Sequence, residues 1–151
     1  MKSTLSSNTS NSFFYRFKAE DIIVRLGTHD LSQPSEDAVD QSVAEIILHN
    51  AFNKRTRENN IAILKLASRV RPSEYIRSIC LPTGRLIPGQ MAFVVGWGAT
   101  RNPGPASDIL METALPIWRT QICNDTLDRA IYPTQVCAGW KSGDKDTCPV
   151  I

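Results

Sequence analysis

FVVGWG, residues 93–98, is the stretch from which the fold of this chain can be inferred most directly. An apolar, partly β-branched run stands directly before two glycines that flank a tryptophan. Such side chains favour extended backbone, and glycine permits a tight backbone path beside a large ring. The stretch therefore predicts a β-strand that ends in a close turn.

Similar strand-like runs lie on both sides of this stretch, separated by clusters of Pro, Gly, Asn and Ser. They are Ile22–Leu26, Val43–His49, Ile61–Leu66 and Leu110–Ile117. One segment, Thr120–Leu127, favours a short helix. Many short strands with turn signals between them indicate an all-β barrel or sandwich.

Length and charge set the limits for function. The 151 residues suffice for the core of one domain or for parts of two small ones, and the net charge of +2 is weak. The cationic cluster Lys54–Arg57 is partly offset by Glu58, so we expect a solvated loop rather than a nucleic-acid surface. No apolar run approaches the roughly 18 residues that span a bilayer, so no membrane contact is expected.

The four cysteines are Cys80, Cys123, Cys137 and Cys148. None stands in a CxxC pair or near either histidine, which argues against zinc, and no metal or cofactor is expected. An even number of cysteines in a small β-rich chain favours disulfides and an oxidising compartment. Reduced, buried thiols are the alternative.

Six strings in order resemble the chymotrypsin/trypsin-like serine proteases, particularly arthropod clip-type and trypsin-like members. The strings are VRLGTHDL (24–31), IILHNAF (46–52), NNIAILKL (59–66), ICLP (79–82), VVGWGAT (94–100) and VCAGWKSGDKDTC (136–148). The resemblance covers about Lys18 to Cys148 and implies two antiparallel β-barrels with an active site between them.

The resemblance also implies how the chain is divided. Residues 1–17 form a polar N-terminal segment that we expect to be disordered, and residues 18–79 belong to a partial first barrel. Residues 80–90 link it to a partial second barrel, residues 91–151, which ends before the segment of the catalytic serine. We therefore expect a homologue that is truncated at both ends.

The catalytic mechanism of this family needs a serine nucleophile, a histidine base and a buried aspartate. The Ala-Ala-His-Cys and Gly-Asp-Ser-Gly-Gly strings that carry the first two are absent from the sequence, and Asn60 stands where the family has its aspartate. His29 and His49 match surface positions instead. The resemblance thus predicts a catalytically inactive chain with no intact catalytic residue.

Two acidic features have different expected roles. Asp146 precedes Thr147-Cys148, where trypsin-like enzymes carry the acidic base of the primary specificity pocket, so it indicates descent from a protease that prefers Arg or Lys. Glu36, Asp37 and Asp40 lie where some family members bind calcium, but we expect them to be solvated.

The cysteines also follow the family in part. The resemblance pairs Cys123 with Cys137. It leaves Cys80 and Cys148 unpaired and able to form intermolecular disulfides, because their usual partners lie outside the chain. Asn124-Asp125-Thr126 is a glycosylation sequon, so Asn124 is a candidate site if the protein is exported.

These features support an extracellular, inactive trypsin-like serine protease homologue, although no signal peptide is visible. Two alternatives remain open at this point. In the first, the sequence is an incomplete gene model of an active secreted endopeptidase. In the second, the chain is a non-catalytic cofactor that binds proteins of an extracellular proteolytic cascade. A β-rich binding module with accidental likeness is the remaining hypothesis.

Overall fold

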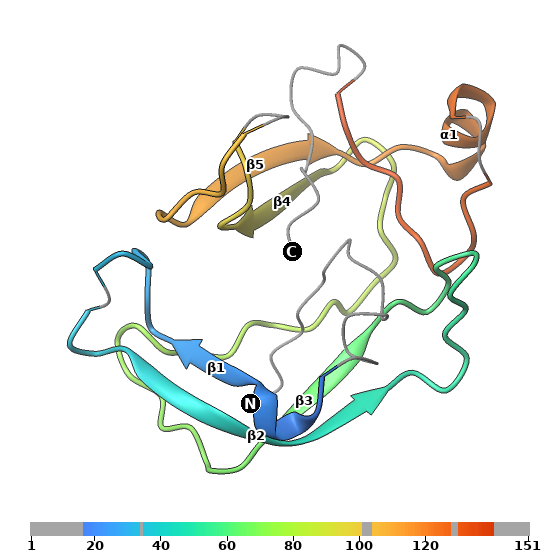
Figure 1. The fold of residues 1–151 in the computed structure, drawn as a ribbon. Helices are drawn as coiled ribbons and strands as arrows, with labels where there is room; N and C mark the ends of the chain where they lie inside the picture. Colours follow the sequence, from blue (N-terminus) through green and yellow to red (C-terminus); the bar gives the residue numbers. More distant parts are fainter. Residues whose placement is uncertain (1–16, 34, 101–103, 128–129, 141–151) are drawn as a thin grey trace. The chain divides into compact units, whose positions relative to one another are not determined.

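The computed structural model describes residues 17–33, 35–100, 104–127 and 130–140 (Figure 1). These residues form short antiparallel strands and one short α-helix. They divide into two compact units, with the boundary between Cys80 and Leu81. No helix among them is both long and apolar enough to span a bilayer.

The first unit is built on a three-stranded antiparallel sheet in the order β1-β2-β3. A 3-10 helix, η1 (Ala19–Asp21), precedes β1 (Ile23–Leu26). β1 pairs with the first half of β2 (Val39–Leu48), and β3 (Ala62–Leu66) pairs with the second half. The long strand β2 therefore connects the other two.

The core of this unit follows the alternation of side chains along β3. Ala62 and Leu64 point inward, with Leu64 only 3% exposed, whereas Ile63 and Lys65 on the opposite face are exposed. Successive side chains of a strand face opposite sides of the sheet, so one face of β3 is buried and the other faces outward. Val43 and Ile76 complete the buried set.

Gly27 turns the chain out of β1 with a φ of +74°. A Cβ at this position would lie 3.1 Å from both Ile76 Cγ1 and the backbone oxygen of Asp37. Glycine is therefore favoured twice here, by the left-handed backbone and by the close approach of Ile76.

The second unit contains β4 (Met91–Gly96) and β5 (Met111–Pro116), paired antiparallel along their whole length. The helix α1 (Thr120–Thr126) follows, and Ile117 pairs with Ala138 as an isolated bridge beyond β5. Its buried apolar side chains are Leu115, Ile117 and Cys123.

The expected all-β class with one short helix is confirmed, as two antiparallel sheets that do not close into a barrel within the described residues. The main difference concerns β2, which begins at Val39 rather than at the predicted Val43. The cause is that Val39–Ser42, polar in part, pair with β1. Phe93, predicted within a strand, lies in β4 but is 70% exposed.

Candidate functional site

Asn60 ends the loop that connects β2 to β3, and it is half-buried. The backbone N–H of Ile61 donates to the oxygen of Asn59 at 2.8 Å, so the chain makes a three-residue turn centred on Asn60. The N–H of His49 donates to the oxygen of Ile61 at 3.3 Å, which continues the β2–β3 pairing beyond the strands. These bonds fix the backbone at Asn60.

The residue before it supports the same turn. Asn59 has a φ of 53°, and its side-chain Nδ2 donates to the oxygen of Ala51 at 2.9 Å. Asparagine is one of the few residues that enter the left-handed region at modest cost. Asn59 therefore helps to form the turn that leads into Asn60.

The chemistry available at Asn60 is that of a neutral amide. A carboxylate would accept the Nδ1–H of a catalytic histidine and stabilise the imidazolium that forms during proton transfer, but an amide carries no charge to do so. His49, at the start of the same loop, is exposed, and its Nδ1 accepts a hydrogen bond from the N–H of Ala51 at 3.2 Å. This nitrogen caps the turn. His29 is also exposed.

Cys123 and Cys137 form a disulfide, the pair that the resemblance implied. The bond joins the buried side of α1 to the segment that runs beside the end of β5. This segment is also held by its backbone: the N–H of Trp118 donates to Cys137 at 2.9 Å, and the N–H of Gly139 donates to Pro116 at 3.1 Å. The covalent and hydrogen bonds together place the segment 137–140.

Two indole groups hold the same segment, a feature that sequence reasoning missed. Trp118 Nε1 donates to the oxygen of Gly139 at 2.7 Å, and Trp140 Nε1 donates to the oxygen of Ala114 at 3.0 Å. One indole thus bonds to the segment that follows α1, and the other bonds from that segment to β5. The only signal in the sequence was the tryptophans themselves, since an indole N–H is a strong donor that usually finds an acceptor in a folded protein.

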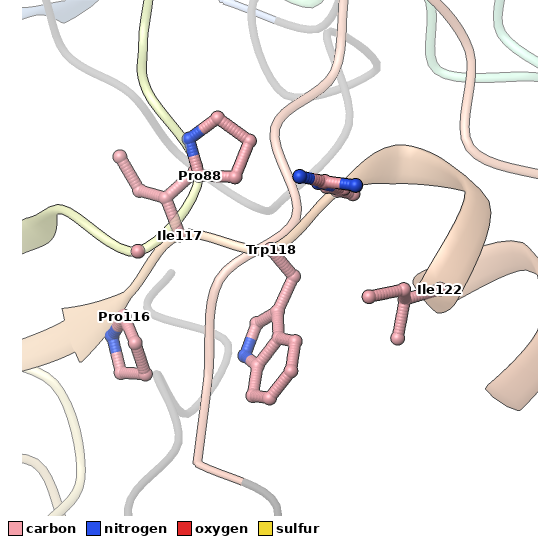
Figure 2. A pocket seen from close by; sticks show the side chains of 7 residues that line it. Pro88, Pro116, Ile117, Trp118 and Ile122 are labelled. Atoms are coloured by element: carbon pink, nitrogen blue, oxygen red, sulfur yellow. The ribbon is translucent and has the colours of Figure 1, made fainter.

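A shallow apolar groove of about 250 Å³ lies at the end of β5, close to α1 (Figure 2). Figure 2 shows the side chain of Ile122 projecting from α1 toward Trp118. Pro88 and Ile117 lie on the opposite side of Trp118 from Ile122. Its lining residues are Pro88, Gly89, Pro116, Ile117, Trp118, Arg119 and Ile122. The groove could hold an aliphatic side chain, but no nucleophile or general base lines it.

The predicted acidic loop is only partly a loop. Asp40 belongs to β2 and is the cross-strand partner of Arg25 in β1. Arg25 Nε and Nη2 donate to the two carboxylate oxygens of Asp40, both at 2.7 Å. Glu36 and Asp37 are exposed. Nowhere in the described part of the chain do three His, Cys, Asp or Glu residues gather in a way that could hold a metal ion.

Cys80 and Asn124, two further residues that the sequence singles out, lie in the described part of the chain. Cys80 is an exposed free thiol at the end of the first unit. Asn124 is on α1, where its Oδ1 accepts a hydrogen bond from the N–H of Ile131 at 2.7 Å. Asp146 and Cys148 lie outside the described residues.

Comparisons with known proteins agree with the strings in the sequence. A family model described as Trypsin matches residues 9–149. The chain is 38% identical over 133 residues to the proclotting enzyme of Tachypleus tridentatus, a match covering 83% of this chain and 36% of that protein. It is 35% identical over 133 residues to a venom protease of Bombus pensylvanicus, covering 83% and 54% of the two chains. The matched part is thus about a third to a half of these relatives.

Proposed function

This chain belongs to the trypsin-like serine protease family, and on that premise we propose that it is a catalytically impaired member. The observation that carries the proposal is Asn60, at the position where the family has the triad acid. The turn around Asn60 is well formed, so the substitution changes the chemistry at an ordered position rather than accompanying a loss of local structure.

The expected impairment follows from the role of the acid. The carboxylate holds the catalytic imidazole in the tautomer whose Nε2 can take the serine proton, and it stabilises the resulting positive charge. An amide in its place can present its NH₂ group and select the wrong tautomer. In an otherwise intact triad of this family, the change from Asp to Asn lowers kcat by about 10⁴.

A fluorophosphonate probe, which reacts only with an activated serine, tests the proposal. We expect the purified chain to show no stoichiometric labelling and no hydrolysis of an Arg-containing peptide substrate. Active trypsin in the same buffer is the positive control. Stoichiometric labelling of the chain at one serine would overturn the proposal and support an active endopeptidase.

The variant Asn60→Asp refines the same test. Because the sequence contains neither an Ala-Ala-His-Cys nor a Gly-Asp-Ser-Gly-Gly string, we expect this variant to remain unlabelled as well. A large gain of labelling in Asn60→Asp alone would mean that the chain supplies the other two groups, and that Asn60 is the sole cause of the impairment.

We also propose that Asp146 derives from a specificity pocket for Arg or Lys side chains. Its support is its place before Thr147-Cys148 in a chain that belongs to this family. A carboxylate at such a site pairs with a guanidinium or ammonium group. Weak binding of benzamidine that is lost in Asp146→Asn is the expected result, and equal binding by both proteins would contradict it.

An extracellular setting and a role beside other proteases complete the proposal. The Cys123–Cys137 disulfide fits an oxidising compartment. A relative named as a proclotting enzyme supports a place beside proteins of a proteolytic cascade, and Asn60 is the reason to propose a non-catalytic role there. The exposed thiol of Cys80 offers one point for an intermolecular disulfide with such a protein.

A further inference from the structure

The loop Asn53–Glu58, here named the basic loop, carries Lys54, Arg55 and Arg57 at its surface. Its single acid, Glu58, is half-buried, and its Oε2 accepts a hydrogen bond from the hydroxyl of Thr56 at 2.9 Å. The carboxylate is thus bound within the loop, whereas the side chains of Arg55 and Arg57 are exposed. Within the described residues, neither arginine forms an ion pair.

The basic loop is held in one conformation by Asn53. The Oδ1 of Asn53 accepts from the N–H of Arg55 at 2.9 Å and from that of Thr56 at 3.3 Å. Its backbone oxygen accepts from the N–H of Arg57 at 2.8 Å, and its own N–H donates to Glu58 at 3.1 Å. A loop ordered in this way loses little conformational entropy when a ligand binds.

Arg57 occupies a position that suits glycine better. Its φ is 62°, in the left-handed region, which costs a residue with a Cβ roughly 1–2 kcal/mol. Backbone strain of this kind is found preferentially at functional sites. An arginine at such a position presents its charge at some cost in stability.

Glu36 and Asp37, two exposed acidic residues of the same unit, lie at the other end of β2 from the basic loop. Ten residues of extended strand are about 30 Å long, and the whole of β2 stands between these two carboxylates and the basic loop. This separation exceeds the Debye length of about 8 Å at physiological salt. Glu36 and Asp37 therefore do little to screen the exposed arginines of the basic loop.

We propose that the basic loop is a docking surface for an acidic peptide segment of a partner protein, with Arg55 and Arg57 pairing to its carboxylates. The guanidinium group matches a carboxylate through two parallel hydrogen bonds. Arg25 and Asp40 of this chain already pair in this way at an exposed site. Single-stranded nucleic acid would need aromatic side chains for base stacking, and the basic loop has none. The inference goes beyond the impaired triad, since such docking requires no catalysis.

Fluorescence anisotropy with a labelled peptide rich in Asp and Glu tests this surface on the full chain. We expect binding at about 50 mM salt that weakens markedly at about 300 mM, because the contacts are between exposed charges. Arg55→Gln/Arg57→Gln should weaken binding by about tenfold or more, which corresponds to 1.4 kcal/mol. Arg55→Lys/Arg57→Lys keeps the charge but lacks the guanidinium group that donates two parallel hydrogen bonds to a carboxylate. We therefore expect an intermediate loss of affinity for the peptide.

Arg69→Gln/Arg71→Gln is the matched control, since both arginines are exposed and belong to the same unit but lie after β3. It removes the same charge and should leave binding within about twofold of the wild type if the basic loop is the site.

Arg57→Gly removes one charge, and glycine adopts the left-handed backbone of this position without strain. It therefore tests the loop in a variant that should remain folded. It should also weaken peptide binding.

Equal loss in the control variant would overturn the proposal, because binding would then depend on net charge alone. If a sulfated polysaccharide or an oligonucleotide binds to the basic loop more tightly than the acidic peptide does, the partner is not an acidic peptide and the proposal is wrong. Salt-sensitive self-association in sedimentation would identify a second copy as the occupant, again against the proposal. All readouts are binding measurements, so their failure is distinct from a failure of the impaired-triad proposal.

Discussion

At the scale of single residues, the chemistry depends on which polar group stands at an ordered position. Asn60 differs from aspartate by an NH₂ group in place of an oxygen. Its backbone is held by bonds among Asn59, Ile61 and His49, none of which uses the side chain of residue 60. These backbone bonds are available to asparagine and to aspartate alike.

The Arg25–Asp40 pair gives a prediction about pH at this scale. The hydrogen bonds from Arg25 lower the pKa of Asp40 below its ordinary value. A carboxyl group with a lowered folded-state pKa contributes stability above its unfolded pKa, about 3.9, and loses that contribution as the pH falls through the folded value. Asp40→Asn should therefore lower Tm slightly near pH 7 and have no effect well below about pH 3.

Thermal unfolding of the wild type and Asp40→Asn between neutral and acid pH measures this difference. The effect should be small and should weaken with added salt, because the pair is exposed. Asp37→Asn is the control, since that exposed carboxylate makes no ion pair among the described residues. A Tm difference for Asp40→Asn that persists unchanged into acid would contradict the assignment.

At the scale of elements, α1 depends on its connections to the rest of the second unit. It is seven residues long, too short to be stable as an isolated helix in water. Cys123 ties its buried side to Cys137, and Asn124 bonds to the backbone of Ile131. The helix is therefore stabilised by tertiary bonds rather than by its own propensity.

Removing the disulfide tests this dependence. On the chain-entropy model, a bridge that closes a loop of about 15 residues contributes about 3 kcal/mol. Cys123→Ser/Cys137→Ser should lower the free energy of unfolding by an amount of that order, measured by urea titration under non-reducing conditions. Cys80→Ser, at the exposed free thiol, should have little effect. Equal losses in the two proteins would argue against the structural role of the bridge.

At the scale of the whole molecule, the described chain consists of two units joined through a long irregular segment. Residues 67–90 contain no helix or strand, and most of their side chains are exposed. Chain segments with exposed backbone and few hydrogen bonds open most easily to proteases. The connection between the units is therefore the expected weak point of the described chain.

Limited digestion with trypsin gives the prediction at this scale. Cleavage after Arg85, which is exposed and follows a glycine with nothing near its Cβ position, should precede cleavage after Arg25 in β1 or Lys65 in β3. Mass spectrometry of early time points identifies the order of the cuts. If Arg85→Gln leaves the early digestion pattern unchanged, Arg85 is not the first site to be cut, and the prediction is wrong.

Much of the local structure could be predicted because it depends on neighbouring residues. Four strand-like runs, the FVVGWG strand and the short helix match β1 to β5 and α1, with the main error at the start of β2. That error arose because the pairing of Val39–Ser42 with β1 stabilises residues whose own pattern is partly polar. The exposure of Phe93 was also hidden, since a strand pattern does not say which face another layer covers.

The family, the all-β class and the amide at residue 60 could be read from the sequence alone, because they depend on residue identity and on the order of short strings. The two indole bonds and the Arg25–Asp40 pair were found only in the folded structure. All three join residues far apart in the chain. Such bonds depend on strand register and side-chain direction, which change with the packing of the whole unit and not with the local sequence alone.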